Sequence, residues 1–485
     1  MDWEEELDNC KKHVHQLISE GHSGLRQPSY PTQSLAFLHR LQNTQSKNPS
    51  LPLQAKHSLK IIISGAGLGG LSTAIALRRR GHTVTVYERA QRLDEVGAGI
   101  QVPPNSSRLL LKWGIGKYLH GKANEPEAIR MRRWENGKVI GLTRLGPAFR
   151  EEFGAPYWVV HRANLQIALY ELAVDLGVEV HVGNGVKGYE EGTPSVILED
   201  GSVDQGDLVV AADGIKSAAR KIVLRGEDQP PQKAGFAAYR AMVDTGRMKD
   251  DPDISWLLDH PGQNLWIGPA RHVMTYSVAG GKSFNMVLSH PESSDPATWN
   301  QTTALLEMKS HFRTWDPALR KLINMIDTTL KWPLLTGKPL PHWLSPSNKL
   351  LIIGDAAHPM VPYMSSGAAM AVEDGAALAE ILSLISNPTD LVPALKVFEK
   401  IRILRTGQMQ EASLVNGKIW HFEDGAEQRA RDAAMRVEVE GGLVRESANQ
   451  WSDPVTRGWV FGYDAEREIR EAWGESKEGG RGARL

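Results

Sequence analysis

The chain has 485 residues with 41% hydrophobic and 23% charged side chains, an ordinary globular composition that excludes disordered and fibrous classes. Its 56 basic and 57 acidic residues leave a formal charge of −1, which offers no positive field for nucleic acid or for an anionic membrane. One cysteine, Cys10, excludes an intramolecular disulfide and cysteine-based metal sites, and no apolar run approaches the roughly 18 residues of a membrane span.

The first 57 residues differ from the rest of the chain. They are polar and turn-rich, with helical apolar spacing only at 35–41, and we expect an extension outside the core fold. Regular elements then begin. The β-branched run 60–64 predicts a buried parallel strand, 71–80 predicts a helix, and 83–87 predicts a second strand, which together form a β–α–β unit.

A glycine motif connects the first strand to the helix. Gly65 permits a tight turn, Gly67 lets the backbone approach a pyrophosphate, and Gly70 lets helix and strand pack closely. Glu88 ends the second strand 18 residues after Gly70, where a carboxylate can accept hydrogen bonds from a ribose diol. This context predicts a dinucleotide site. A second match to the motif at 183–188 is followed by residues that cannot continue as an apolar helix, and there we expect a hairpin turn.

Two later strands end in an aspartate–glycine or glycine–aspartate pair. One breaks at Asp213, and the other stops at Asp355 and leads into a long helix that opens with Gly367 and Ala368. An aspartate at a strand end can cap the next turn and bind a sugar hydroxyl, and a helix start of small residues lets a flat ring system approach backbone N–H groups. Further strands are expected at 178–182, 195–199, 207–212 and 350–353.

The three motifs in this order resemble the single-component FAD-dependent aromatic monooxygenases, the p-hydroxybenzoate hydroxylase class. The stretch PMVPYMSSGAAMAVEDGAAL, residues 359–378, most resembles the salicylate hydroxylase-like branch, and the pattern at 450–464 resembles its fungal members. The resemblance covers about residues 58–470. It implies an α/β fold with a Rossmann-type FAD-binding domain built on a parallel sheet, an inserted β-sheet-rich substrate domain, and a helical C-terminal region.

Short alternating runs, with few helical patterns before residue 301, mark the inserted region. The expected domains are an N-terminal extension at 1–57, a discontinuous FAD-binding domain at 58–235 and 345–415, a β-rich substrate domain at 236–344, and a C-terminal region at 416–485 whose tail, from Glu475, we expect to be frayed.

The resemblance also implies a set of cofactor-binding residues, namely Gly65, Gly67, Gly70, Glu88, Arg162, Asp213, Asp355, Gly367 and Ala368. The glycines of the first motif would cradle the FAD pyrophosphate, and Glu88 would hold the adenosine ribose. Arg162 would contact the ribityl–phosphate region, Asp213 would serve both FAD and a transient nicotinamide, and Asp355 would bind the ribityl chain or the pyrophosphate. Gly367 and its neighbours would lie beside the isoalloxazine.

For the reaction, the resemblance implies that NADPH or NADH acts as transient reductant and that O2 hydroxylates a small, electron-rich aromatic substrate through a C4a-hydroperoxyflavin. Tyr239 and Arg240 stand where relatives carry a tyrosine–arginine pair that faces the active site. Arg240 would hold a phenolate or carboxylate through two parallel hydrogen bonds, although an ion pair at a strand end is the alternative. Tyr363 is a further pocket candidate, and a general base is expected but not identified.

Other protein classes share parts of this pattern. An NAD-dependent dehydrogenase needs only the first motif, and a Baeyer–Villiger enzyme needs a second dinucleotide fingerprint. A flavin halogenase carries a GWxWxIP segment that residues 458–461 lack. A non-catalytic flavoprotein would bind FAD without substrate-stimulated NAD(P)H oxidation. The nearest alternative is a secondary-metabolism flavin oxygenase that epoxidises or dearomatises an indole or a polyketide.

We expect no resident metal, no nucleic-acid partner and no membrane span, and the oligomeric state is open. The acidic start and the single cysteine favour a cytoplasmic protein. The last three residues, Ala483, Arg484 and Leu485, fit the small–basic–Leu form of a C-terminal peroxisomal signal, so a peroxisomal location is the alternative.

Overall fold

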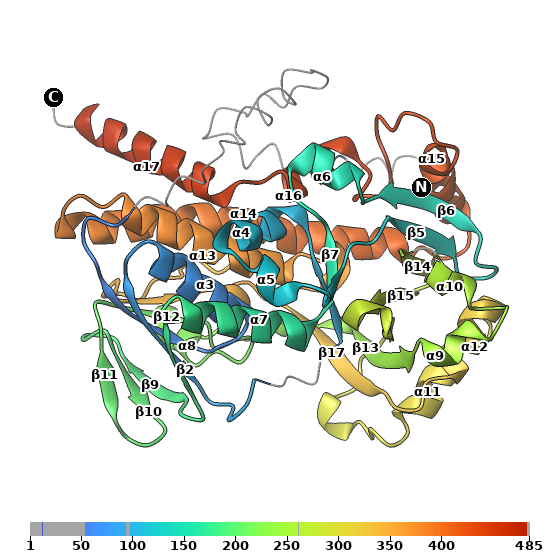
Figure 1. The fold of residues 1–485 in the computed structure, drawn as a ribbon, viewed down its shortest axis with the longest axis horizontal. Helices are drawn as coiled ribbons and strands as arrows, with labels where there is room; N and C mark the ends of the chain where they lie inside the picture. Colours follow the sequence, from blue (N-terminus) through green and yellow to red (C-terminus); the bar gives the residue numbers. More distant parts are fainter. Residues whose placement is uncertain (1–11, 13–53, 94–97, 260, 483–485) are drawn as a thin grey trace.

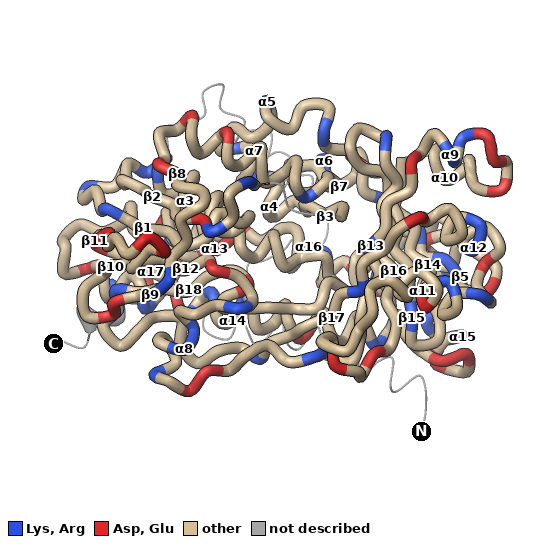
Figure 2. Tube along the Cα trace, turned by 90° about the horizontal axis from the view of Figure 1, so that it is seen from below, with Lys and Arg blue, Asp and Glu red and all other residues tan. Residues whose placement is uncertain are grey.

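The computed structural model describes residue 12 and residues 54–93, 98–259 and 261–482 (Figure 1). The helical spacing noted at 35–41 lies outside the described residues. So do residues 483–485, on which the peroxisomal alternative depends, and that alternative stays a prediction. Within the described ranges no helix is both long and apolar enough to cross a membrane. Basic and acidic positions are interspersed over both halves of the molecule (Figure 2).

A five-stranded sheet forms the core of one half. Its spatial order is β18 (Leu350–Ile352), β12 (Leu208–Ala211), β1 (Lys60–Ser64), β2 (Thr83–Glu88) and β8 (Glu179–Val182). Every adjacent pair is parallel. Residues 61–63 are all fully buried, as expected for a parallel sheet that is covered on both faces. The helix α3 (Leu68–Arg79) follows β1 and packs against α7 (Arg162–Asp175) and α13 (Gly367–Ser383).

The predicted strands of this sheet are confirmed, but the second glycine motif is not a hairpin. Strand β9 (Val186–Glu190) begins within that motif and pairs with β10 (Ser195–Leu198), which pairs with β11 (Val203–Gln205). Because β8 and β9 belong to different sheets, the segment joins two sheets. As expected, no dinucleotide-type helix follows it. A second three-stranded sheet contains β3 (Gly99–Val102), β7 (Trp158–His161) and β4 (Ala123–Asn124).

A seven-stranded sheet forms the other half (Figure 1). Its order is β17 (Leu330–Thr336), β13 (Gln232–Asp244), β16 (Ser283–Pro291), β15 (Arg271–Val278), β14 (Gln263–Gly268), β5 (Ala128–Arg133) and β6 (Val139–Arg144). The pairing of β14 with β5 is parallel and the others are antiparallel. This sheet extends beyond the range 236–344, since β5 and β6 come from the stretch that we assigned to the FAD-binding domain.

Helices complete the two halves. The short or peripheral ones are α4 (Pro104–Trp113), α5 (Gly116–Leu119), α6 (Ala148–Phe153), α8 (Ala219–Val223), α9 (Gly246–Lys249), α10 (Trp256–Asp259), α11 (Ala304–His311), α12 (Pro317–Asn324), α15 (Ala426–Val439) and α16 (Pro454–Phe461). The long helix α14 (Leu391–Trp420) packs against α13 and α17 (Ala465–Gly482) and ends beside β15, so it spans both halves (Figure 1).

The chain beyond Glu475 is not frayed where the structure describes it. Helix α17 continues to Gly482, and Trp473 on this helix is buried. Lys477 forms an ion pair of 2.9 Å with Asp390 at the start of α14. The glycine-rich composition suggested a loose tail, but contacts with the body of the protein hold this segment as a helix.

Candidate active site

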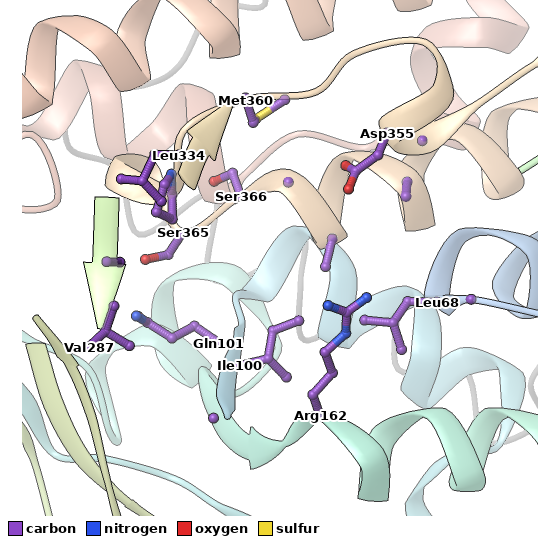
Figure 3. Close-up of a pocket in the computed structure, with 18 of the residues that line it drawn as sticks. Leu68, Ile100, Gln101, Arg162, Val287, Leu334, Asp355, Met360, Ser365 and Ser366 are labelled. Atoms are coloured by element: carbon purple, nitrogen blue, oxygen red, sulfur yellow. The ribbon is translucent and has the colours of Figure 1, made fainter. Parts of the chain in front are cut away.

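A cavity of about 310 Å³ lies between the carboxyl ends of the parallel strands and one face of the seven-stranded sheet (Figure 3). It begins at the glycine turn after β1, where Gly67 lines it, and it ends at Met274 and Val287 on the second sheet. Crevices at the carboxyl ends of parallel strands are the usual ligand sites of such sheets. The cavity is long enough to bring residues from both halves to one ligand site.

The three glycines of the turn have two different reasons to be glycine. A Cβ atom on Gly65 would lie 2.4 Å from the carbonyl oxygen of Ala212, and one on Gly70 would lie 1.9 Å from the carbonyl oxygen of Gly65. A Cβ atom on Gly67 would meet no atom within 4 Å, and Gly67 lines the cavity. The packing of the chain itself therefore requires glycine at positions 65 and 70, whereas the absent side chain of Gly67 leaves room for a ligand.

The first turn of α3 fits a phosphate group. Gly67 is its N-cap, no side chain caps it, and the turn carries no acidic residue. The N–H groups of a helix start have no intrahelical acceptors and, with the helix dipole, favour an anion. The residues present therefore fit the pyrophosphate of a dinucleotide.

Glu88 and Asp213 lie next to this turn but do not line the cavity. The two carboxylate oxygens of Glu88 accept hydrogen bonds from the backbone N–H groups of Ala66 and Ala90, both at 2.8 Å, which fixes the carboxylate at the end of β2. Oδ2 of Asp213 accepts from the hydroxyl of Tyr189 at 3.0 Å. Oδ1 of Asp213 is buried and has no hydrogen-bond partner among the described residues. A buried acceptor left in this way costs about 1–3 kcal/mol unless a ligand donates to it.

Asp355 and Arg162 reach into the cavity from opposite sides (Figure 3). Asp355 comes from the 3-10 turn η3 (Gly354–Ala356) after β18, and Arg162 is the first residue of α7. Gly367 and Ala368, which open α13, also line the cavity. These four residues therefore lie together on the flavin side that the resemblance implies.

A buried ion network holds the turn that carries Asp355. Oδ2 of Asp374 accepts from the N–H of Gly354 at 3.0 Å and from Nε2 of His358 at 2.7 Å. Its other oxygen accepts from Nε of Arg402 at 2.8 Å. Burial alone would raise the pKa of the Asp374 carboxyl, but its interactions with His358 and Arg402 hold that pKa below its usual value. Asp374 and His358 are thus structural supports of the turn.

The segment before α13 contains two adjacent serines, Ser365 and Ser366. Ser365 adopts a left-handed conformation with φ of 53°, and the hydroxyl of Ser366 donates to the carbonyl of Met364 at 2.8 Å. Both serines line the cavity, and Figure 3 shows the Ser365 hydroxyl directed into it near Gln101. The two serines add hydroxyl groups to the wall near the opening of α13.

The structure separates the expected pair Tyr239 and Arg240. Arg240 lines the cavity, whereas Tyr239 is fully buried on the opposite face of the sheet and stacks on His290 with ring centroids 4.7 Å apart. Successive side chains of a strand point to opposite faces, so neighbours in sequence cannot share one face. We therefore retain Arg240 and remove Tyr239 from the candidate site.

The sequence reasoning missed the strand next to these residues. His272, Met274 and Tyr276 alternate along β15 and all line the cavity. Burial lowers the pKa of His272 well below its usual value. Burial raises the pKa of Tyr276, and the positive charge of Arg240 partly offsets that rise. The alternation of residues 272–279 was visible as a strand pattern, but nothing in it indicated which face would meet the ligand.

Tyr363 and three tryptophans of the second half differ in their surroundings. Tyr363 is buried without lining the cavity, and its ring meets that of His272 edge-on at 5.3 Å. Trp266 is fully buried, as expected of a core residue. Trp332 is 46% exposed and Trp299 is half-buried, so neither is a core residue.

A cavity that starts at a dinucleotide turn and ends at a second sheet suits a flavoprotein that holds a bound dinucleotide against a small substrate. The family described as FAD binding domain matches residues 58–409, and the chain belongs to this family. The prediction of a single-component FAD-dependent monooxygenase, salicylate hydroxylase-like in fold, is confirmed by the relatives that follow.

The chain is 36% identical to the FAD-dependent monooxygenase OpS4 of Beauveria bassiana (strain ARSEF 2860), over 84% of this chain and 96% of that protein. It is 35% identical to 3-hydroxybenzoate 6-hydroxylase 1 of Aquipseudomonas alcaligenes, over 83% and 97%. The structure of a salicylate hydroxylase substrate complex matches with a TM-score of 0.69 at 25% identity, over 86% of this chain and 98% of that one.

Proposed function

We propose that this protein uses FAD, NAD(P)H and O2 to hydroxylate a small aromatic substrate that carries a phenolic hydroxyl and an acidic group. The observation that carries the proposal is the composition of the cavity end on the second sheet. Arg240 and the neutral His272 lie there among the apolar side chains of Met274, Val287 and Leu334. A flat ring with one anionic and one ionisable substituent matches these groups.

The residues at the other end would hold FAD. Gly67 and the first turn of α3 would receive the pyrophosphate, Asp355 would accept from a flavin hydroxyl, and Gly367 would lie beside the ring system. Bound FAD would supply the redox chemistry, accepting electrons from NAD(P)H and activating O2. Two of the relatives named above act, by their names, on hydroxylated benzoates, which supports the choice of substrate class.

The protein groups at the substrate end orient the ring and manage its proton. Arg240 would bind the carboxylate or phenolate through its planar guanidinium. His272, kept neutral by burial, can accept the phenolic proton on a ring nitrogen, and an ionised phenol is the better nucleophile. The apolar side chains exclude water from the reacting atoms.

The test measures NAD(P)H and O2 consumption by the flavin-loaded protein with 3-hydroxybenzoate, salicylate, an indole panel and a polyketide panel, and identifies oxygenated products by mass. We expect stimulation by hydroxybenzoates. Arg240→Lys should keep its flavin yet divert O2 to hydrogen peroxide, because lysine keeps the charge without the planar fork. Arg247→Lys, which alters an exposed arginine paired with Asp327, is the matched control. Stimulation by indoles or polyketides alone would instead favour the secondary-metabolism oxygenase.

A further inference from the structure

Two histidines from distant parts of the chain meet at the wall of the cavity. His272, near the start of β15, lines the cavity and is 4% exposed. His421 follows α14 as its C-cap residue and is half-buried. Nδ1 of His272 and Nε2 of His421 are 2.8 Å apart, a hydrogen-bond distance. The pair therefore connects the cavity with the outer end of α14.

The surroundings of the two rings fix their geometry. The backbone N–H of Ala270 donates to the carbonyl of His421 at 3.2 Å, which ties the end of α14 to the start of β15. The ring of Phe236 stacks on His421 with centroids 4.9 Å apart, and that of Trp420 meets His272 edge-on at 5.2 Å. Packing on both sides keeps the two nitrogens in contact.

The charged groups around the pair disfavour a resident positive charge. Burial holds the pKa of His272 well below its usual value, and burial together with Arg431 on α15 lowers the pKa of His421 to about 3. Tyr363 on the neighbouring turn is neutral, because burial raises its pKa to about 12. The Arg133–Asp424 ion pair lies beyond Arg431, and no described carboxylate is at hydrogen-bond distance from either ring.

This electrostatic setting limits what His272 can do alone. A histidine that is strongly disfavoured as a cation cannot keep a proton taken from a phenol. It can still transfer one if it receives a proton on one nitrogen while it gives up the proton on the other. The second nitrogen of His272 contacts His421, and Nδ1 of His421 has no hydrogen-bond partner among the described residues and belongs to a half-buried side chain.

We propose that His272 and His421 form a proton relay that carries the hydroxyl proton of a phenolic substrate out of the cavity to solvent at the end of α14. The substrate O–H gives its proton to Nε2 of His272, Nδ1–H of His272 gives its proton to Nε2 of His421, and Nδ1–H of His421 gives its proton to water. Each ring ends neutral in its other tautomer. The reverse transfer, when the product phenolate is protonated, restores both. The relay rests on the phenol-hydroxylating function proposed above.

The experiment observes the proton directly, without turnover. Oxidised, flavin-loaded protein in weak buffer at about pH 8 is mixed with 3-hydroxybenzoate in a stopped-flow instrument, and a pH indicator and phenolate absorbance are recorded together. Wild type should release a proton as the bound phenol ionises. In His421→Gln, both signals should slow by about 10²-fold, the lower range of general acid–base effects. The ligand 3-methoxybenzoate, which has no proton to give, should produce neither signal.

Controls separate the relay from a structural role. His421→Ala with added imidazole should regain the fast phase, which a merely packing residue would not. His290→Gln alters a fully buried histidine on the face of the second sheet that is opposite to His272, and it should leave the fast phase unchanged. In wild type, the rate constant of proton release in H2O–D2O mixtures should vary nonlinearly with the deuterium fraction, because more than one proton moves in the step.

Two failures are distinguishable. If wild type neither binds nor ionises any phenol of the panel, the proposed function fails and the relay with it. If wild type ionises 3-hydroxybenzoate and folded, flavin-loaded His421→Gln does so equally fast, or if the deuterium dependence in wild type is linear, the relay alone is overturned.

Discussion

At the end of the cavity beside α3, the wall consists mainly of backbone: a turn of glycines, the start of a helix, and the turn after β18 that carries Asp355. At the other end, side chains on one face of β13 and β15 form the wall, and the backbone behind them is an ordinary antiparallel sheet. At the first end, the absent side chain of Gly67 leaves room for a ligand. A ligand at the second end is recognised by which side chains the strands carry, so that end can change specificity without a change of fold.

The largest effect should come from a glycine that the backbone requires. In Gly70→Val the new side chain would meet the carbonyl oxygen of Gly65, where even a Cβ atom would lie 1.9 Å away. Because a backbone atom cannot yield as a side chain can, we expect a loss at or beyond the upper end of the ~1–3 kcal/mol typical of overpacking.

The matched variant is Gly67→Val, whose Cβ enters open space. It should keep the unfolding free energy of the apoprotein and lose flavin, because the side chain occupies the pyrophosphate position. Urea unfolding of both apoproteins and the flavin absorbance of both purified proteins test the contrast. Equal stability of the two variants would show that the glycines are not distinguished in this way.

The support behind the Asp355 turn gives the second prediction. Arg402 is fully buried between Glu373 and Asp374, at 2.9 and 2.8 Å. Arg402→Met removes the buried cation that Glu373 and Asp374 share, leaving Glu373 with Arg405 alone, and should cost about 3–5 kcal/mol. The control, Arg470→Met, removes a half-exposed partner of Glu380 and should cost no more than about 1 kcal/mol. Urea unfolding measures both, and similar losses would contradict the network's role.

The two ends of the cavity also differ in how far the sequence predicts them. The glycine turn of the flavin end follows from residues close together in the chain, since the turn, the helix start and the strand that carries Glu88 all lie within one β–α–β unit. The distant residues of that end, Arg162, Asp355 and Gly367, were expected only from the family resemblance. The alternation rule likewise implies that Tyr239 and Arg240 cannot share a face, but no local pattern says which of them faces the ligand.

The meeting of His272 with His421 could not be predicted from the sequence, because it depends on where a 30-residue helix ends relative to a strand about 150 residues earlier. The strands β5 and β6 joined the second sheet for a similar reason. Local pattern marks them as strands, and only the tertiary fold decides which sheet they extend. The helical end of α17 depends on docking contacts that its glycine-rich composition does not reveal.

The third prediction concerns Asp355 itself. Its side chain is exposed on the cavity wall and forms no hydrogen bond or ion pair with the described residues, so its replacement should leave the apoprotein's stability unchanged. Asp355→Ala removes the proposed acceptor for a flavin hydroxyl and should weaken FAD binding by about 1–3 kcal/mol. Asp355→Asn keeps an acceptor oxygen and should lose less. Titration of each apoprotein with FAD gives the affinities, and an unchanged affinity in Asp355→Ala would make it a turn residue only.

The smallest expected effect is a pH dependence of stability that comes from one buried histidine in each half of the molecule. His82 and His290 are both fully buried, and burial lowers the pKa of each from 6.5 to about 4, with Arg80 adding to the effect at His82 and His311 at His290. Between these two pH values the unfolded chain binds a proton at each site and the folded chain does not. Stability should therefore fall as the pH falls through this window, by up to about 1.4 kcal/mol per pH unit for each histidine.

Urea unfolding of the apoprotein at pH 6.5 and at pH 5 measures this slope. His82→Asn, in which the amide oxygen can still accept from the N–H of Leu59, should reduce the slope by one histidine's share, and His290→Gln should do the same in the other half. If the two halves unfold together, the reductions should be additive in the double variant, because the sites lie in separate cores and share no partner. If only one variant changes the slope, the half that contains the other histidine would unfold outside the measured transition, and the halves would be independent in stability although they share one cavity.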